Sequence, residues 1–498
     1  MSESQGFVGD LIAKIKEGAS EKKEEIDREL PFVVMLFALL STSGVSRYDS
    51  WKRMRKLTLL PRFKEESEEV VRQVEVLGKD PLTAMYDRAE DTGSKAYRDF
   101  LGGFISSIKS GGKVSDYMQS KLRTIFELRS KEMVRSTEKI ATMVEGYSVM
   151  LIVILCVYIL YALLSSTSTM EIMAGMSIPT SPIITYLITF VMMPFISVIF
   201  MLIANTIQKS TLLNLKGLYK KAMISLGVSV GIFIAFMLVP SLSESIEMPL
   251  VLTICLTAGV LPGAFEYYKI TRVNYNAEES LPSFLRDITE SQKTGISPEK
   301  SIIHATKRRD YGKFSQFLSL VRSQIEWGVS LKDIFENFKQ KIHSWLVLVD
   351  FMMMVETIEV GGGQVRALEI LSEYSEKELE AQINKRALLK PYVILAFVWS
   401  VLIALTTTIV TMTMYILTQF STPSLFEVMS AEIVGQMSIF SLGIIFQCWI
   451  SGFFIGKISE GNFAAGFKYC ALLAITAYVS LVVSQNFMVE IFGVALPT

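Results

Sequence analysis

The sequence holds few of the residues that most often build metal and redox sites. Only two histidines and four cysteines occur among 498 residues. His304 and His343 have no cysteine cluster nearby, so we expect surface or packing roles for both. No two cysteines form a Cys-x-x-Cys pair, so neither a zinc site nor a disulfide framework is expected. The four cysteines all lie in apolar stretches: Cys156, Cys255, Cys448 and Cys470.

Motifs of nucleotide and ester chemistry are also missing. The nearest match to a phosphate-binding loop, GFFIGKIS at 452–459, lacks the glycine spacing and the Ser or Thr after the lysine. No nucleophile elbow occurs. Lys+Arg and Asp+Glu are equal at 49 each, so no overall positive charge indicates nucleic acid as a partner. We therefore expect no enzyme, no cofactor and no nucleic acid.

Basic residues are absent from four long stretches, residues 147–206, 222–268, 391–456 and 469–498. Because about 20 apolar residues cross a bilayer as a helix, these stretches predict seven membrane spans. The predicted spans are residues 146–166, 184–206, 222–241, 248–267, 391–416, 432–454 and 469–491.

All 49 basic residues then lie on one side of the membrane, which the positive-inside rule makes the cytoplasm. The N-terminus is predicted to be cytoplasmic and the C-terminus outside. Residues 1–28 form a charged helical lead without the apolar core of a signal peptide.

The predicted spans contain no Lys, Arg, Asp or His, which is unfavourable for an ion-coupled transporter. A pore lined by Ser, Thr, Asn205, Gln436 or Gln447 stays open. Gly227 and Gly231 form a Gly-x-x-x-Gly face in the third span, for which internal helix packing is the first expectation and self-association the second.

The two polar blocks of the chain carry an internal repeat. Leu30-Pro31, twelve residues and Gly44 match Leu281-Pro282, twelve residues and Gly295, at a constant offset of 251. Proline in a first turn and glycine after a last turn predict one helix in each copy, opened by the proline. The run FVVMLFALL at 32–40 lies inside this repeat and is too short to span, so a buried bundle helix is expected.

A second register follows at an offset of 217, where Asp80-Pro81 matches Ser297-Pro298 and Gly111 matches Gly328. The first copy therefore holds 34 extra residues, including RFKEESEEVVRQVEVLGKD, which predicts an added charged helix. The second copy has its own surplus, WLVLVDFMMMVETIEVGGGQVRALEI, where three glycines indicate a helix stop and tight turn.

A basic cluster follows the repeated helix in each copy. One reading is contact with anionic lipid headgroups, and the sharper one is a docking surface for an acidic cytoplasmic partner. The candidate docking residues are Lys52, Arg53, Arg55, Lys56, Lys307, Arg308 and Arg309.

The sequence thus predicts an all-α polytopic membrane protein with about seven transmembrane helices and two homologous cytoplasmic helical bundles. The predicted parts are the lead at 1–28, the first bundle at 29–145, four spans at 146–268, the second bundle at 269–390 and three spans at 391–498.

Two segments carry a resemblance to a known family. LPSFLRDITESQKTGISPEKSIIHA at 281–305 resembles the leading helix of the type II secretion F domain. VETIEVGGGQVRALEILSEYSEKELEAQI at 355–383 is similar to that family's glutamate, glycine-rich turn and long helix, here Glu359 with Gly361, Gly362 and Gly363. The first copy departs from the family by being more apolar and lacking the glycine-rich turn. Seven spans and a charged lead are more similar to the archaeal branch.

The resemblance implies a membrane assembly platform of an archaellum or an archaeal type IV pilus, which binds a hexameric secretion-type ATPase and does not hydrolyse ATP itself. It also implies pilin or archaellin subunits as membrane partners, and it suggests a homodimer. The competing hypotheses are a polytopic transporter or export channel, and a membrane scaffold unrelated to filaments.

Overall fold

The structure is a computed structural model that describes residues 2–171, 186–208, 210, 212–238, 247–361, 364–418 and 423–492. Its described elements are helices, and no strand occurs among those residues. The all-α prediction is therefore confirmed.

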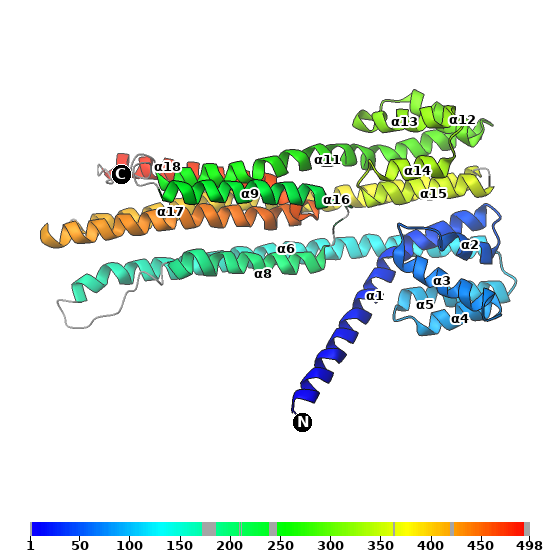
Figure 1. The fold of residues 1–498 in the computed structure, drawn as a ribbon, viewed down its shortest axis with the longest axis horizontal. Helices are drawn as coiled ribbons and strands as arrows, with labels where there is room; N and C mark the ends of the chain where they lie inside the picture. The colour runs from blue at the N-terminus through cyan, green and yellow to red at the C-terminus, as the bar shows by residue number, and fades with distance from the viewer. Residues whose placement is uncertain are drawn as a thin grey trace. The chain divides into compact units, whose positions relative to one another are not determined.

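The chain divides into two compact units (Figure 1). Unit 1 comprises Met1–Met133 and Arg272–Gln382, and unit 2 comprises Val134–Thr271 and Ile383–Thr498. The domain limits expected from the sequence differ from these bounds by several residues and stay a prediction.

The helices of unit 1 come from both repeat copies. The first copy supplies α1 (Ser2–Thr42), α2 (Arg47–Met54), α3 (Pro61–Glu75), α4 (Pro81–Asp91) and α5 (Lys95–Lys109). The second supplies α12 (Pro298–Arg308), a 3-10 turn (Gly312–Phe314), α13 (Ser315–Glu326), α14 (Leu331–Lys339) and α15 (Trp345–Gly361). Three long helices contribute residues to both units: α6 (Val114–Glu171), α11 (Met248–Lys293) and α16 (Val365–Thr418).

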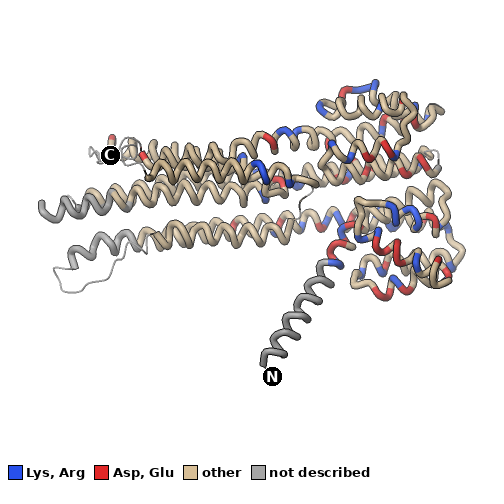
Figure 2. Tube along the Cα trace, in the orientation of Figure 1, with Lys and Arg blue, Asp and Glu red and all other residues tan. Residues whose placement is uncertain are grey.

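The remaining helices belong to unit 2. They are a π-helical turn (Ile188–Met192), α8 (Met193–Ile207), α9 (Lys216–Met237), α17 (Pro423–Glu460), a 3-10 turn (Phe463–Ala465) and α18 (Gly466–Phe492). Seven helices of the described chain are long and apolar enough to cross a membrane, one in each predicted span, so the prediction of seven is confirmed. Figure 2 shows long stretches without charged residues along these helices.

The apolar run at 32–40 lies in α1, and each of its side chains is at most 2% exposed. α1 is not among the helices that could span a membrane. The predicted buried bundle helix is therefore confirmed. Burial of this run removes nine apolar side chains from water, which provides much of the driving force that folds unit 1.

The prediction that each proline opens a helix is wrong. Pro31 lies inside α1, and Pro282 lies inside α11. Both helices begin well before the repeat, at Ser2 and Met248, so neither proline marks a helix start. The glycine half of the pattern is confirmed, since Gly44 and Gly295 follow the helix ends with φ of +80° and +86°.

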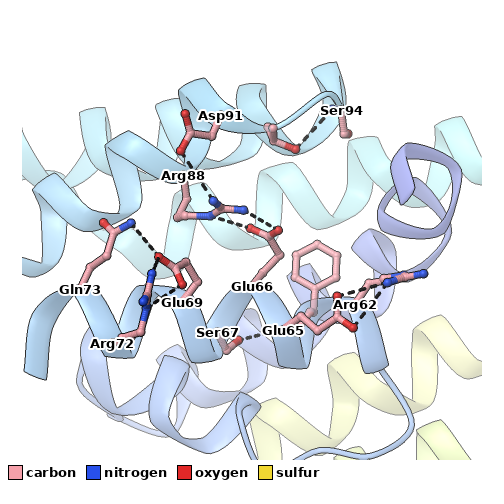
Figure 3. Close-up of polar contacts among 12 residues, drawn as sticks. Arg62, Glu65, Glu66, Ser67, Glu69, Arg72, Gln73, Arg88, Asp91 and Ser94 are labelled. Atoms are coloured by element: carbon pink, nitrogen blue, oxygen red, sulfur yellow. Dashed lines mark hydrogen bonds and ion pairs between the residues drawn. The ribbon is translucent and has the colours of Figure 1, made fainter. Parts of the chain in front are cut away.

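The extra residues of the first copy form α2 and α3, which confirms the added charged helix. α3 packs beside α4, and Figure 3 shows the ion pairs at this contact. The Arg88 guanidinium donates to both carboxylate oxygens of Glu66, at 3.1 and 2.7 Å. The Glu29 carboxylate accepts from the backbone N–H of Phe63 at 3.1 Å and so caps the start of α3.

One hydrophobic core joins the two repeat copies inside unit 1. Phe32 of α1 meets Trp345 of α15 edge to face, with ring centroids 4.7 Å apart. The Trp345 indole N–H donates to the backbone oxygen of Leu59 at 3.1 Å. The copies are therefore held as one body by apolar packing as well as by a specific hydrogen bond.

Unit 2 is packed most closely between α17 and α18, which lie side by side in Figure 1. A Cβ atom added to Gly456 would overlap the backbone of Gly466, so the glycines permit this close approach. Gly227 and Gly231 of α9 behave differently, because nothing lies within 4 Å of a Cβ added to either one. The expected internal packing of that glycine face is absent from the described residues.

Polar side chains of the spans meet inside unit 2. The Tyr147 hydroxyl lies 2.9 Å from Ser197 Oγ and 2.6 Å from Ser451 Oγ, and Gln447 donates to Ser197 at 2.8 Å. Gln447 is buried in this network and lines a small cavity together with Tyr147 and Ser451, and the pore stays a prediction. Asn205 is exposed, and the side chain of Gln436 lies outside the described residues.

Candidate functional site

A groove that involves predicted site residues lies within unit 1. It has a volume of about 790 Å³ and is lined by α2 and the turns on either side of it, and by α14 and α15. It therefore contains residues of both repeat copies. Three of the predicted docking residues line this groove: Lys52, Arg53 and Lys56.

A glycine turn, a helix cap and two buried side chains position α2 at the groove. Gly44, with φ of +80°, turns the chain after α1. Ser46 caps α2, because its hydroxyl accepts from the Asp49 N–H at 3.1 Å. Trp51 and Met54 are fully buried, so the basic side chains of α2 are left on its outer side.

The basic residues of α2 differ in how far their charges are neutralised. Arg53 Nη1 pairs with Glu356 of α15 at 3.3 Å, where it ties the two copies together. Lys52 Nζ pairs with Glu75 at 3.0 Å, and Arg55 reaches the same carboxylate at 3.9 Å. Among the described residues Lys56 has no carboxylate within ion-pair distance.

The ion pair between Lys52 and Glu75 shifts the pKa of both groups. The hydrogen bond to Glu75 raises the pKa of Lys52 above its ordinary value, and Lys52 lowers the pKa of Glu75 in return. Both groups are solvent-exposed, so the pair keeps its charges at neutral pH while adding little to stability.

The floor of the groove is apolar and its far wall is mixed in charge. Phe335, Met352 and Val355 are buried beneath it. Lys332 of α14 pairs with Glu359 of α15 at 2.5 Å, and this glutamate is the one that the family resemblance singled out. Gly361 ends α15, whereas Gly362 and Gly363 lie outside the described residues. The groove therefore combines an apolar floor with a rim that carries charges of both signs.

The second basic cluster does not line this groove. Lys307 pairs loosely with Glu326 at 3.8 Å, and Arg308 pairs with Asp287 at 3.4 Å. Lys307, Arg308 and Arg309 therefore stay predicted docking residues that lie outside this groove.

Sequence reasoning missed the buried charged side chains of unit 1. Arg129 of α6 and Glu378 of α16 form a bidentate ion pair, and Asp350 of α15 accepts a hydrogen bond from Ser375 at 2.7 Å. Burial raises the pKa of Asp350 to about 7. A single aspartate inside the apolar run WLVLVDFMMMV was a signal in the sequence, whereas the pairing of residues 249 positions apart was not.

The described residues hold no group of three or more His, Cys, Asp or Glu side chains arranged to bind a metal ion. His304 lies 3.0 Å from the Ser291 hydroxyl, and burial lowers the pKa of His343. The groove thus offers binding surface and charge.

A helical fold with two repeat copies and seven candidate spans defines a multi-pass membrane protein. Comparison with known proteins gives the family. The model of type II secretion system protein F matches residues 34–162 and again residues 284–412, which together are more than half of the chain. The chain belongs to the type II secretion system protein F family.

The two matched regions follow the internal repeat, so the family domain occurs twice. An uncharacterised protein of Methanocaldococcus jannaschii is 21% identical over 495 residues, which cover 93% of this chain and 80% of that protein. No solved structure matches. Membership in the family implies a role in type II or type IV filament assembly machinery, as a membrane platform and without an enzymatic activity of its own.

Proposed function

We propose that this protein is the integral-membrane platform of an archaeal type IV filament machine, either an archaellum or an adhesion pilus. In this role unit 1 lies in the cytoplasm and binds a hexameric secretion-type ATPase. The spans receive pilin or archaellin subunits, and in an archaellum they also take part in rotation. The observation that carries the proposal is the double match to the protein F family on a chain with seven candidate spans.

The topology supports a cytoplasmic unit 1. No Lys or Arg occurs in the segments between spans that a cytoplasmic N-terminus would place outside. This distribution follows the positive-inside rule, with the C-terminus outside. An archaeal source of the relative agrees with an archaeal machine, and the seven spans agree with the same branch.

Within unit 1 we assign ATPase docking to the groove. Lys52 and Lys56 present positive charge on its rim, and the apolar floor supplies area for an anchor side chain. Arg53 serves mainly to hold α2 against α15 through Glu356. Rim cations speed and orient the encounter, while the buried floor carries most of the binding free energy.

The docking assignment is tested with the Lys52→Glu/Lys56→Glu double variant in the full-length protein. We expect binding of the cognate secretion-type ATPase at moderate salt to weaken at least tenfold, because two attractive charges become repulsive. The control is Arg123→Glu/Lys131→Glu, which makes the same charge change at exposed positions of α6 outside the groove. Unchanged binding by the groove variant would refute the docking site.

The platform role itself is tested by deleting the gene and imaging the cell surface by electron microscopy. Loss of filaments, restored by the intact gene, is expected. Normal filaments would refute the platform role. Solute flux through vesicles that contain the purified protein alone, with filaments intact, would favour a transporter or channel.

A further inference from the structure

The helix α9 is the least buried of the seven candidate spans. Only 11% of its apolar stretch is covered by other described residues, whereas the other six spans are 28–67% buried. One side of α9 packs on α11 (Figure 1), where a Cβ atom added to Gly259 would lie 3.0 Å from Ser229 Oγ. A Cβ atom added to Gly263 would likewise lie 2.9 Å from the Ala222 methyl group. In a membrane the opposite side of α9 is therefore open to lipid.

Lysine residues gather at one end of this helix pair. Within α9 and the part of α11 that belongs to unit 2, the charged residues are Lys216, Lys220, Lys221, Lys269 and Glu266. Four lysines thus stand beside one carboxylate. The positive-inside rule puts this end of both helices at the cytoplasmic surface of the membrane.

The nearby carboxylates are already engaged. Lys221 Nζ pairs with Glu266 Oε1 at 2.8 Å, across the contact between α9 and α11. Glu460 of α17 accepts from the Tyr267 hydroxyl at 2.8 Å and pairs with Lys468. The other three lysines are exposed and have no carboxylate within ion-pair distance among the described residues. We call these three the basic patch: Lys216, Lys220 and Lys269.

The residues next to the basic patch are apolar and exposed. Met223 and Ile224 lie one turn from Lys220 toward the middle of α9 and are 74% and 59% exposed. Tyr268 precedes Lys269 and is 58% exposed, and tyrosine is enriched where lipid headgroups meet acyl chains. A lysine can lay its stem along apolar surface while its ammonium group stays among the headgroups. Charge and apolar surface thus follow each other in the order of a phospholipid's headgroup and chains.

We propose that the basic patch binds the headgroup of a negatively charged phospholipid, whose acyl chains lie along Met223 and Ile224. The charges are complementary, because the patch carries three cations and the headgroup carries a phosphate. The site requires only that α9 and α11 lie in a membrane. It is independent of filament assembly and of the ATPase groove, since no residue of the patch lines that groove.

A transmembrane segment of a filament subunit is the competing occupant of this side of α9. Such a segment would cover Met223 and Ile224, but it would need acidic groups at the membrane surface to meet the three lysines. A negatively charged phospholipid supplies the apolar chains and the phosphate in one molecule. It therefore accounts for the whole surface with a single ligand.

The test is native mass spectrometry of the full-length protein in mild detergent, titrated with phosphatidylglycerol and separately with phosphatidylcholine, which has no net charge. We expect the wild type to bind phosphatidylglycerol at least tenfold more tightly. In Lys216→Gln/Lys220→Gln/Lys269→Gln the affinity for phosphatidylglycerol should fall at least tenfold, because each lysine near an anionic lipid contributes roughly fivefold. Binding of phosphatidylcholine should not change.

The matched control removes three other basic residues from the described part of unit 2: Arg135→Gln/Lys139→Gln/Lys390→Gln. These side chains are exposed on α6 and α16, outside the basic patch. The control variant should bind phosphatidylglycerol within twofold of the wild type. Replacement of the three patch lysines by arginine keeps the charge and should also preserve binding. Unchanged thermal unfolding of all variants in detergent shows that the fold is intact.

Four outcomes would overturn the proposal. They are equal affinity of the wild type for the two lipids, unchanged affinity of the glutamine variant, equal losses in the glutamine and control variants, and binding of glycerol 3-phosphate as tight as that of phosphatidylglycerol. Equal losses would mean diffuse attraction of lipid to all basic residues, and tight binding of glycerol 3-phosphate would mean that acyl chains contribute nothing. Loss of a filament subunit from the purified glutamine variant, with lipid affinity unchanged, would assign the lysines to the subunit instead.

Discussion

The Arg129 guanidinium donates two hydrogen bonds to the Glu378 carboxylate, from Nε at 2.9 Å and from Nη2 at 2.8 Å. Arg129 belongs to α6 of the first repeat copy and Glu378 to α16 of the second. The Glu378 side chain is only 4% exposed, and the guanidinium lies over the Phe32 ring at 4.7 Å. A charge-assisted, bidentate pair thus joins the copies at a largely buried position of unit 1.

Removal of one partner should be far more costly than removal of both. Arg129→Met leaves the buried Glu378 charge without its cation, and we expect it to lower the free energy of unfolding by roughly 3–5 kcal/mol. Arg129→Met/Glu378→Leu should recover most of that loss. The measurement is thermal unfolding of the full chain. Unfolding is detected by adding a protease that cleaves unit 1 only when unit 1 is unfolded.

The matched control for this prediction is Arg123→Met on the same helix. Its partner Glu127 is 60% exposed and its pair is of the ordinary surface kind. We expect a change within about 0.5 kcal/mol. Equal losses for the two arginine variants would contradict a buried ionic contact between the copies.

The carboxyl of Asp350 predicts a dependence of stability on pH. Burial raises its pKa to about 7, above the unfolded value near 3.9. Between these values the folded state holds a proton that the unfolded state has lost, so stability falls as the pH rises from about 4 to about 7. The slope for one group is roughly 1.4 kcal/mol per pH unit. Burial raises the pKa of Glu29 to about 7 as well, and it contributes in the same direction.

Asp350→Asn tests this prediction because it keeps the shape and removes the titration. It should leave stability nearly unchanged at about pH 4 and raise it at pH 8, with a smaller pH slope than the wild type. Unfolding curves at four pH values between about 4 and 8 measure the slope. A slope identical to that of the wild type would show that Asp350 titrates normally in the folded protein.

The close contact between α17 and α18 predicts a sharp difference between two glycines in the spans. Gly456→Ala places a methyl group into the Gly466 backbone, and we expect a loss of about 1–3 kcal/mol or failure to assemble. Gly231→Ala in α9 meets open space and should be tolerated. The fraction of monodisperse protein after detergent extraction measures both. Similar yields for the two variants would mean that α17 and α18 move apart at little cost in free energy.

The contacts of Trp345 with Leu59 and Phe32 predict that two substitutions of this tryptophan destabilise unit 1 to different extents. Trp345→Phe loses the hydrogen bond to the Leu59 oxygen and should cost about 1 kcal/mol. Trp345→Ala also removes the ring that packs on Phe32 and should cost about 3–5 kcal/mol. Thermal unfolding ranks the two variants. A larger loss for the phenylalanine variant would contradict the apolar contact as the main contribution.

Helix type, the seven spans and the repeat could all be predicted from the sequence, because each depends on periodic or compositional signals that act locally. The apolar run at 32–40 was correctly placed in a bundle, since its length rules out a span. The start of the repeated helix was predicted wrongly at Pro31 and Pro282. A proline signals a helix start only when the preceding residues are poor helix formers, and here they continue the helix.

The candidate site was predictable in part. Lys52 and Lys56 stood out as a cluster, but nothing in the residue pattern distinguished them from Lys307, Arg308 and Arg309, which do not line the groove. It also did not show that Arg53 is occupied by Glu356, because the two residues lie 303 positions apart. Pairing over such distances depends on which helices the core brings together.

The sequence by itself determined which segments are helical, which can enter a membrane, and which parts repeat. These properties follow from hydrophobic length and residue spacing, which are present in the linear chain. Only the tertiary structure decided which charges are neutralised by a neighbour and which remain exposed to a partner. That outcome depends on side-chain distances between helices far apart in sequence, such as Arg129 with Glu378 and Arg88 with Glu66.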